Sequence, residues 1–592
     1  MPVLFTERLG AIRAALSDQT WILLLTFLLL LAWYSVLPYR LFRRLGVPGP
    51  MPLPFLGTFL HYRKGMFGFD TECYKKYGKM WGIYDGRQPI LCLMDPDLIK
   101  TIFIKEFYTL FTNRRDFGLN GPLAESILIV QDDHWKRIRS VLSPTFTSGR
   151  LKEMCPIISH YVENLVKNAK KKAELNESAD MKDIFGTYSM DVVTSTAFSV
   201  DVDSINNPND LFIINIKKLI EFSFFDPVLM LALAFPAVIP ILSKLNFSFF
   251  PRDVNTFFTN VLVNLKAKRQ KGVHTDRVDF LQLMVDSQVA SVSAEKQNGD
   301  GKSTGKALTD SEILAQAMTF IFAGYETTSN TLSYTAHNLA THPDVQKKLQ
   351  QEIDEAFPNK APPTYDGVMQ LEYMEMVISE TLRMFPPAPR IDRVCKKDVQ
   401  LNGITIPKGT VVMVPAYVLH RDPEYWPEPE EFRPESGVIL AILQSFGTLL
   451  TPVIPERSLP MALQSPQLSC SELWGTVQPS DLPASPGPSP SVMATRPTSA
   501  PTPLKFLFSK ENRESRDPHI FLPFGMGPRN CIGMRFAQLM MKMALASFLQ
   551  HLSIVPCKET SIPLEMDVKG PMHPKKPVIL KFVPRVNADS KQ

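Results

Sequence analysis

A long apolar stretch without a charged residue lies near the N-terminus, over residues 21–37. Its length is at the short end of what spans a bilayer as a helix, and Trp21, Trp33 and Tyr34 suit the membrane interface. Three arginines, at 40, 43 and 44, follow directly, so the positive-inside rule places the rest of the chain in the cytoplasm. A cleaved signal peptide is the alternative, but its apolar region is usually shorter. We therefore predict an uncleaved anchor over residues 1–46, with one transmembrane helix over about 21–37.

The pattern then changes to a stiff connector and a mixed body. Four prolines between Val47 and Pro54 cannot continue a helix, so residues 47–56 are predicted to form an extended hinge. From Gly57 to about Asp286 helical patterns dominate, with short strands over 80–94. The body, residues 57–592, is predicted to be one large domain that is mainly α-helical with small β-sheets.

Two later elements have clear local signals. Thr309 and Glu312 match a capping box, which predicts a helix from there to about Thr341, before His342-Pro343 stops it. Such a helix has about 30 residues and is about 45 Å long, enough to cross a large domain. Residues 399–414 are predicted to form a β-hairpin with Asn402-Gly403 as its turn. Residues 287–306 are polar and are predicted to form a loop.

Residues 222–250 are unusually apolar but contain prolines at 227, 236 and 240. The prolines argue against a second transmembrane span. Two interpretations remain open: buried core helices, or a membrane-dipping lid over an apolar pocket.

Residues 436–506 differ in composition from the rest of the chain. They contain twelve prolines and only six charged residues, and 482–503 is nearly all Pro, Ser, Ala, Thr and Gly. Low complexity of this kind predicts a weakly ordered insertion.

The overall composition excludes some classes of function. The chain has 592 residues, and its 64 basic and 59 acidic residues give a net charge of +5. This near balance argues against a nucleic-acid partner held by bulk charge. The seven cysteines include no CxxC motif, which indicates neither a disulfide framework nor a zinc site and fits a reducing compartment.

One cysteine has a chemically suggestive setting. Cys531 lies in the glycine-rich segment from Phe524 to Gly533, directly before a predicted helix over 534–550. Helix N–H groups and the helix dipole favour a thiolate there, and the glycines let the backbone approach a flat cofactor. A thiolate on haem iron favours cleavage of an O–O bond. The alternative for a lone cysteine is a buried core thiol.

Three further patterns each have an ordinary alternative. Gly324 to Thr328 lies inside the long helix, where Glu326 and Thr327 could pass protons to a small ligand, or where Gly324 could serve helix packing. Glu380 and Arg383 lie one turn apart, a spacing that is usually a surface ion pair. Trp135 and Arg139 could hold a carboxylate, or Arg139 could be an ordinary surface cation.

Together these segments resemble the cytochrome P450 family. Residues 524–533 meet every fixed position of its F-x-x-G-x-R-x-C-x-G pattern, and the other patterns match its oxygen-activation, E-x-x-R and W-x-x-x-R segments. Several runs, such as FTNRRDFG and LPFGMGPRNCIGMRFA, are similar to family 3, subfamily A. The resemblance implies the P450 fold for 57–592, with Cys531 as the iron ligand of haem b and Thr327 and Glu326 as proton-handling residues. It also implies a buried Glu380–Arg383 network. The implied haem-binding residues are Arg114, Trp135, Arg139, Arg393, Phe524, Arg529 and Gly533. The implied pocket residues are Phe117, Leu128, Phe322, Ala323, Thr327 and Ala388.

The resemblance also implies an activity and a location. A membrane-bound monooxygenase of the endoplasmic reticulum is expected, with its catalytic domain in the cytoplasm. It would oxidise steroids and other lipophilic compounds with O2 and with electrons from NADPH through a reductase. Cytochrome b5 is a second candidate partner, and no nucleotide-binding motif is evident in the chain itself. Lys136, Arg137 and Lys542 either form a basic docking face or are ordinary solvated cations.

Two other functions remain open from the sequence. A haem-thiolate isomerase similar to thromboxane synthase would rearrange a peroxide without a reductase. A membrane-bound ligand-binding protein without catalysis would result if the insertion prevented haem binding.

The sequence departs from the family at one point. The expected F-x-P-E-R-F pattern is broken after Phe432-Arg-Pro-Glu435, and its continuation appears only at Ser509, so the arginine is missing. The insertion is either a natural surface loop or translated non-coding sequence in a faulty gene model. If it is present in the protein, Glu380 and Arg383 are expected to lack a partner, which would put haem incorporation in doubt.

Overall fold

The computed structural model describes most of the chain outside the predicted insertion. The described residues are 18–116, 118–198, 200–204, 206–207, 209–220, 226–245, 247–248, 251–270, 279–288, 307–435, 517–567 and 572–585. The insertion predicted over 436–506, most of the loop predicted over 287–306 and Phe117 lie outside these residues.

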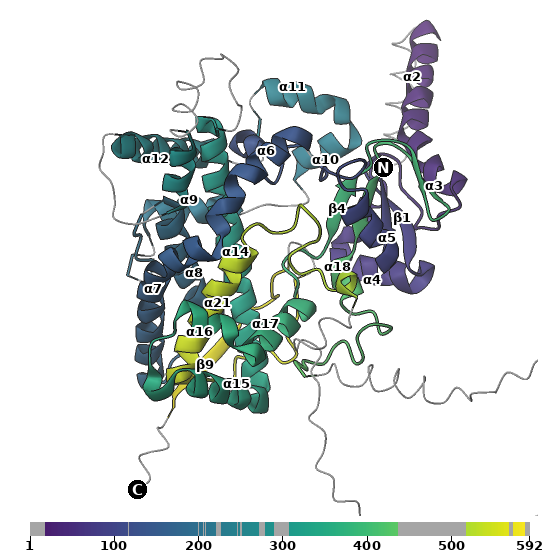
Figure 1. Ribbon diagram of the computed structural model, residues 1–592. Coiled ribbons are helices and arrows are strands. Elements are labelled where there is room, and N and C mark those ends of the chain that lie inside the picture. Colours follow the sequence, from purple (N-terminus) through teal and green to yellow (C-terminus); the bar gives the residue numbers. More distant parts are fainter. Residues whose placement is uncertain are drawn as a thin grey trace, which may run out of the picture.

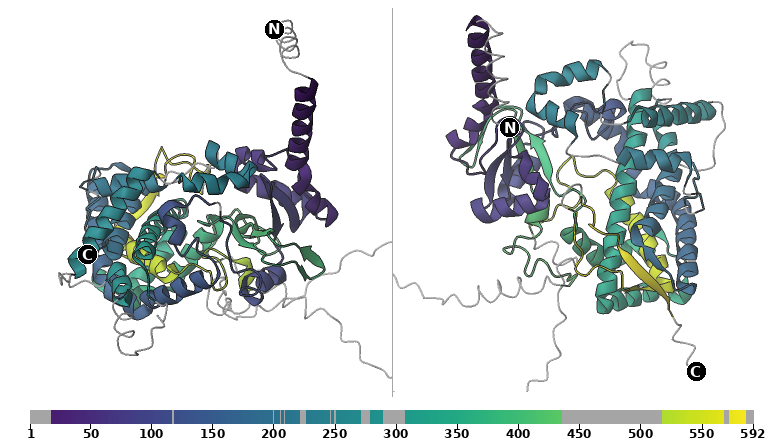
Figure 2. Two further views of the ribbon diagram at one scale, coloured as in Figure 1. Left: turned by 90° about the horizontal axis from the view of Figure 1, so that it is seen from above. Right: turned by 180° about the vertical axis from the view of Figure 1, so that it is seen from behind.

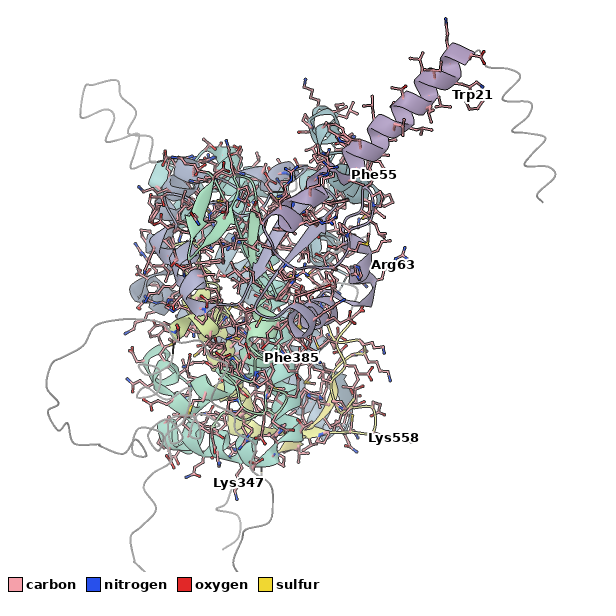
Figure 3. The ribbon with its side chains drawn as sticks, turned by 90° about the vertical axis from the view of Figure 1, so that its right-hand side faces the viewer. Trp21, Phe55, Arg63, Lys347, Phe385 and Lys558 are labelled. Carbon is pink, nitrogen blue, oxygen red and sulfur yellow. The ribbon has the colours of Figure 1, made fainter. Side chains whose placement is uncertain are left out.

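The N-terminal helix α2 (Asp18–Val36) projects away from the body of the molecule (Figures 1 and 2). It continues through the short turn η1 (Leu37–Tyr39) into α3 (Arg40–Arg44). The stretch 18–44 is long and apolar enough to cross a membrane, and almost none of it is buried in the protein. Figure 3 shows Trp21 towards the free end of this helix and Phe55 at its base.

The strands of the described residues form three small sheets. The four-stranded sheet has the order β1-β2-β7-β4, the three-stranded sheet β3-β9-β8 and the two-stranded sheet β5-β6. The first contains β1 (Met80–Asp85), β2 (Gln88–Leu93), β4 (Ile391–Val394) and β7 (Val411–Val414). The others contain β3 (Ser178–Asp180), β8 (Leu552–Pro556), β9 (Ile579–Pro584), β5 (Val399–Leu401) and β6 (Ile404–Ile406). The mainly α fold with small sheets is thus as predicted.

The hairpin predicted over 399–414 is only half correct. Strands β5 and β6 pair around Asn402 and Gly403, which both have positive φ, as a tight hairpin turn requires. Strand β7, however, leaves this hairpin and pairs between β2 and β4. The four residues of β7 are all buried. An apolar strand removes more of its surface from water inside the larger sheet than it would at the exposed hairpin.

The helices form the larger part of the body, on the left in Figure 1. The N-terminal set is α4 (Met66–Tyr77), α5 (Pro96–Lys100), α6 (Asp132–Leu142), α7 (Ser148–Glu174), α8 (Met181–Phe198), α9 (Leu211–Ile220), α10 (Pro227–Ala234), α11 (Ile239–Lys244) and α12 (Arg252–Gln270). The C-terminal set is α14 (Asp310–Thr341), α15 (Pro343–Ala356), α16 (Tyr365–Gln370), α17 (Glu372–Met384), α18 (Ala416–Leu419) and α21 (Met534–His551).

Helix α14 is the central element of the helical part, and its predicted limits are confirmed. The capping box at Thr309 and Glu312 is present in both directions, and the helix ends before His342-Pro343. Helix α8 packs along it, at a point where a Cβ on Gly324 would lie 2.8 Å from Cγ2 of Val193. The packing explanation for Gly324 is therefore correct, because a larger residue would push the two helices apart.

The described part of the apolar segment 222–250, residues 226–245 and 247–248, combines features of both interpretations. Helices α10 and α11 meet at a bend of 112°, caused by prolines at the junction. Leu229 and Leu233 are buried in the core around the first sheet, whereas Leu231, Ile241 and Leu245 are exposed. Figure 1 shows α10 and α11 at the same end of the molecule as α2. The segment therefore covers the core on one side and presents apolar residues on the other.

Candidate functional site

A cavity of about 360 Å³ lies between α14 and the loop that contains Cys531. It brings together most of the residues singled out in the sequence. The predicted residues that line it are Arg114, Leu128, Trp135, Arg139, Ala323, Thr327, Ala388, Phe524, Arg529, Cys531 and Gly533. They come from segments more than 400 positions apart, and the tertiary fold assembles them around one space.

The cysteine loop has a left-handed backbone conformation, which favours glycine, at two positions. Gly525 and Gly527 have φ values of +73° and +68°. A Cβ on Gly527 would lie 1.9 Å from the carbonyl oxygen of Phe103, whereas a Cβ on Gly525 would meet no atom closer than 3.8 Å. The loop closes through a 2.8 Å hydrogen bond from the Cys531 N–H to the Phe524 carbonyl. The turn thus places Cys531 just before α21.

Cys531 is exposed to the cavity that it lines, while the walls of that cavity surround the residue with protein. Burial raises the pKa of Cys531, while the Gly533 N–H and the charges of Arg114 and Arg139 oppose this effect without outweighing it. The N-terminus of the helix therefore favours the thiolate, as predicted, but it does not bring the pKa of Cys531 down to its ordinary value. A cation bound at the sulfur would be needed to keep it deprotonated.

Three arginines fix the position of the cysteine loop: Arg114 and Arg139 from other segments, and Arg529 within the loop itself. Arg139 donates two 2.9 Å hydrogen bonds to Asn530, one to its carbonyl and one to its side-chain oxygen. Arg114 donates to the Arg529 carbonyl at 3.0 Å. The Arg529 guanidinium lies 4.7 Å from the centre of the Trp135 ring and donates to backbone carbonyls of residues 128 and 130. The predicted W-x-x-x-R pair is thus in direct contact with the cysteine loop.

These buried cations lack a matching number of anions. Burial lowers the pKa of Arg393 and of Arg529 to about 9 each, and repulsion from Arg114 adds to the effect. Asp392 at Arg393, and Asp132 and Asp392 at Arg529, only partly offset the lowering of these pKa values. Among the described residues, Nε of Arg393 and Nε of Arg529 are buried without a hydrogen-bond partner. Unpaired buried donors of this kind indicate a site for an anionic group.

The structure separates the two residues predicted to handle protons. Thr327 opens into the cavity, with its hydroxyl donating to the Ala323 carbonyl at 2.7 Å. Glu326 lies on another face of α14, where a carboxylate oxygen is 2.9 Å from Nζ of Lys182. Adjacent residues on a helix point about 100° apart, and here Thr327 lines the cavity beside Cys531 whereas Glu326 does not.

Two other predicted residues lie outside the lining of the cavity, and a third lies outside the described residues. Phe322 is half-buried and packs against the main hydrophobic core. Arg393 is fully buried behind the cysteine loop, with its guanidinium 4.7 Å from the centre of the Phe103 ring. Phe117 is not among the described residues.

An aromatic wall of the cavity was not foreseen from the sequence. Phe146, Phe280, Phe320 and Phe536 line the cavity and contact one another, with ring centres 4.8 Å apart for Phe146 and Phe280. The four rings come from four different segments, so no local pattern joins them. They make this side of the cavity apolar, which suits an apolar ligand.

The predicted Glu380–Arg383 network is present and buried. Arg383 holds Glu380 with two hydrogen bonds of 2.8 and 2.9 Å, and both residues are at most 2% exposed. Arg383 also donates to the carbonyls of His420, Pro429 and Glu431. Glu380 accepts the Arg433 N–H at 3.1 Å. The pair therefore has backbone partners among the described residues, whereas the position of the missing arginine, after Glu435, lies outside them.

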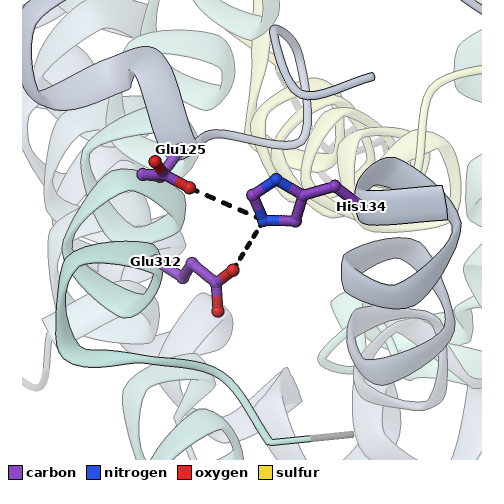
Figure 4. Close-up of side chains that lie close together, drawn as sticks. All are labelled: Glu125, His134 and Glu312. Atoms are coloured by element: carbon purple, nitrogen blue, oxygen red, sulfur yellow. Dashed lines mark hydrogen bonds and ion pairs between the residues drawn. The ribbon is translucent and has the colours of Figure 1, made fainter. Parts of the chain in front are cut away.

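A second cluster links the loop above the cavity to two helices (Figure 4). His134 of α6 lies 2.6 Å from Glu312 of α14 and 3.5 Å from Glu125 of the short turn η4 (Gly121–Glu125). Arg137 also contacts Glu312. Burial alone would raise the pKa of Glu312, but hydrogen bonds from Arg137, the Thr309 N–H and His134 outweigh it and lower the pKa. Because Arg137 binds the same carboxylate, we interpret the cluster as an ion-pair network that connects α6 to α14 rather than as a metal site.

Two residues considered for a docking face are not free cations. Lys542 is 2% exposed and pairs with Glu375 at 3.0 Å, so its assignment to a docking face is wrong. Arg137 forms an ion pair with Glu312. Of the three candidate residues, Lys136 alone is exposed.

Comparison with known proteins agrees with this site. The profile of the cytochrome P450 family matches residues 47–436 and 488–582. Cytochrome P450 3A30 of Fundulus heteroclitus is 49% identical over 570 residues, which cover 96% of this chain and 99% of that protein. Cytochrome P450 3A11 of Mus musculus is 48% identical over 572 residues (97% and 98%), and cytochrome P450 3A27 of Oncorhynchus mykiss is 47% identical over 574 residues (97% and 96%).

The chain therefore belongs to the cytochrome P450 family. Its likeness to members of type 3A over nearly its whole length makes it a monooxygenase of that type. The family binds haem through a cysteine thiolate, and its microsomal class receives electrons from a reductase. The family profile is interrupted at 436, where the insertion was predicted to begin, and resumes at 488, before the predicted end of the insertion.

Proposed function

We propose that the cavity binds haem b, with Cys531 as the ligand of its iron. One observation carries this proposal: a cysteine sulfur opens into a cavity beside buried arginines that lack anionic partners. An iron ion would lower the pKa of the thiol that burial raises. The haem carboxylates would supply the missing negative charge to Arg114, Arg139, Arg393 and Arg529.

The remaining residues of the site fit the same group. Phe524 and Gly533 line the cavity on either side of Cys531 along the chain. Trp135 packs on Arg529 and holds that guanidinium in place. Bound there, haem would supply the oxygen activation by which one oxygen atom enters a C–H bond and the other becomes water.

Thr327 and Glu326 are proposed to handle the protons that this reaction consumes. The Thr327 hydroxyl faces the cavity and can exchange its bond to the Ala323 carbonyl for one to a ligand. Glu326, one residue earlier, faces a different space and would act from behind the helix. The Glu380–Arg383 pair stabilises the region behind the cysteine loop rather than touching a substrate.

We propose lipophilic compounds, including steroids and foreign compounds, as substrates. The aromatic wall, with Leu128, Ala323 and Ala388, offers an apolar surface and few polar groups that could fix one orientation. Phe117 and Phe322 remain predicted pocket residues. The electrons would come from NADPH through the reductase, with cytochrome b5 as a second partner, and Lys136 is an exposed cation for their docking face.

The proposed location is the membrane of the endoplasmic reticulum, with the catalytic domain in the cytoplasm. Residues 1–46 would be the anchor, 47–56 the hinge and 57–592 the catalytic domain, interrupted by 436–506. The base of the anchor contacts the body, since Tyr34 stacks on Phe235 and lies under Arg87. The exposed Leu231, Ile241 and Leu245 would then dip into the bilayer beside the anchor.

A reconstituted assay tests this function. The full chain, the reductase and NADPH in lipid vesicles should convert a steroid into hydroxylated product, and omission of either the reductase or NADPH should abolish it. Conversion of an organic peroxide without reductase, and no NADPH-dependent product, would instead support the isomerase. Binding of the steroid without haem incorporation would support the ligand-binding protein.

A further inference from the structure

A second cavity lies behind α14, on the side to which Glu326 turns. It encloses about 250 Å³ and is separate from the cavity beside Cys531. Its walls come from β3, α8, α14 and the segment before β9, and they are rich in polar groups: Asp180, Lys182, Glu326, Asn330, Ser333 and His573. A space of this size and polarity can hold several ordered waters.

Glu326 is held in this cavity by three groups. One carboxylate oxygen lies 2.9 Å from Nζ of Lys182. The other accepts a 3.0 Å hydrogen bond from Asn330 and lies 3.4 Å from Nδ1 of His573. Glu326 is only 17% exposed at its side chain, whereas His573 is 35% exposed. His573 therefore stands between solvent and a carboxylate that solvent barely reaches.

Lys182 and His573 differ in what they can do for Glu326. Lys182 also donates to Ser329 and to Asn330 of α14, at 2.8 and 2.7 Å, so it fixes the carboxylate relative to the helix. Among the described residues of α14, His573 contacts Glu326 but does not bind the helix as Lys182 does. Histidine also gains and loses a proton near neutral pH more readily than lysine does.

We propose that His573 supplies protons from solvent to Glu326, which makes the second cavity the proton entrance of the oxygen-reducing site. In each transfer the imidazolium Nδ1–H of His573 gives its proton to the nearer Glu326 oxygen. The neutral imidazole, which keeps its other proton on Nε2, then regains a proton at Nδ1 from solvent. Glu326 passes the proton it received on towards the oxygen-reducing site, so no other reactant is needed. Lys182 is a positioning residue in this scheme. The inference rests on the proposed function, in which Glu326 serves oxygen reduction.

The electrostatic surroundings of His573 allow this exchange. Burial lowers the pKa of His573, Glu326 and Asp567 oppose this, and Lys182 adds to it. The other charged groups around the cavity are Asp180, Lys575 and Lys576. The net effect lowers the pKa of His573, so its imidazolium gives up a proton more readily than that of an ordinary histidine.

The test compares His573→Gln with His160→Gln, an exposed histidine of α7 that does not line this cavity. Glutamine keeps a hydrogen-bonding side chain but cannot titrate. In the reductase-supported enzyme, H573Q should raise the share of NADPH electrons released as hydrogen peroxide several-fold. It should also flatten the pH dependence of that share, while H160Q matches the wild type. An equal peroxide share and an unchanged pH profile in H573Q would overturn the inference.

A second readout does not depend on turnover. The pKa of His573, followed by its ring proton resonances, should fall in Glu326→Gln because the carboxylate that favours the imidazolium is removed. An unchanged pKa would show that the two groups are not coupled and would overturn the inference. A wild-type chain that shows no thiolate–haem spectrum would overturn the proposed function and this inference together. A normal spectrum with an unchanged peroxide share overturns this inference alone.

Discussion

Arg139 binds Asn530, the residue directly before Cys531, with two hydrogen bonds of 2.9 Å. One bond holds the backbone carbonyl of Asn530 and the other its side-chain oxygen, so the guanidinium fixes both the position and the rotation of that residue. Because the next residue along the chain is Cys531, this contact sets where the sulfur lies. Arg139 therefore acts on the site from α6 through the loop, in addition to any contact with a bound carboxylate.

The first prediction concerns this contact. Arg139→Lys should lower the free energy of unfolding by about 1–2 kcal/mol and reduce haem retention, because one ammonium cannot replace a two-pronged guanidinium bond. Urea denaturation and haem content per chain measure the two effects. Arg150→Lys, at an exposed ion pair with Glu153 on α7, should change neither. Equal behaviour of the two variants would show that the loop does not depend on Arg139.

The second prediction uses two glycines of the same loop. Gly527→Ala should prevent the loop from forming, since the new Cβ would lie 1.9 Å from the Phe103 carbonyl oxygen. Gly525→Ala also adds a Cβ at positive φ but meets no atom closer than 3.8 Å, so it should cost only about 1–2 kcal/mol. Haem incorporation in a parallel expression compares them. If G527A incorporates haem as well as G525A does, the close approach to Phe103 is wrong.

The third prediction tests the buried pair behind the loop. Arg383→Met should destabilise the fold by about 3–5 kcal/mol, because it leaves Glu380 buried without its cation and removes the donor to three carbonyls. The double variant Arg383→Met, Glu380→Leu should recover part of that loss. Thermal unfolding of both proteins measures the difference. A single variant as stable as the wild type would contradict the assignment of this pair as a structural network.

The fourth prediction concerns acid stability. The pKa of Glu312 is lowered in the folded protein, so the folded state binds this proton more weakly than the unfolded state. Its contribution to stability is therefore complete above its ordinary value near 4.5 and is lost as pH falls through the lower folded pKa. Between about pH 5 and 3 the wild type should lose stability more steeply than Glu312→Gln.

Urea midpoints measured across that pH range test this sign. Glu153→Gln, at an exposed ion pair, should follow the wild-type slope. A steeper slope in E312Q than in the wild type would mean that burial, rather than Arg137 and His134, controls this carboxylate.

Local signals in the sequence predicted the elements that depend on neighbouring residues. The capping box at Thr309, the turn at Asn402-Gly403 and the glycine loop before Cys531 all follow from short-range geometry. Strand β7 was assigned to the wrong sheet because its partners, β2 and β4, are distant in sequence. Patterning indicates that such a strand is buried but does not identify what it pairs with.

The site was predictable where a motif fixes one residue, and less so where orientation matters. Cys531, Trp135 and Arg139 lie together as the patterns indicate. The direction of Glu326 depends on which face of α14 meets α8, and the burial of Lys542 depends on Glu375 of a neighbouring helix. The aromatic wall joins four segments through packing alone.

The most direct test of the account is the reduced carbon-monoxide difference spectrum of the full chain. We predict the long-wavelength Soret band that gives the family its name, since the described residues satisfy Glu380 and Arg383 without the missing arginine. Cys531→Ser should abolish that band. A full-length protein that is folded but lacks the band would contradict the account. In that case, a return of the band on removal of residues 436–506 together with Leu507→Arg would show that the insertion disables the enzyme, and no return would rule out the cavity beside Cys531 as the haem site.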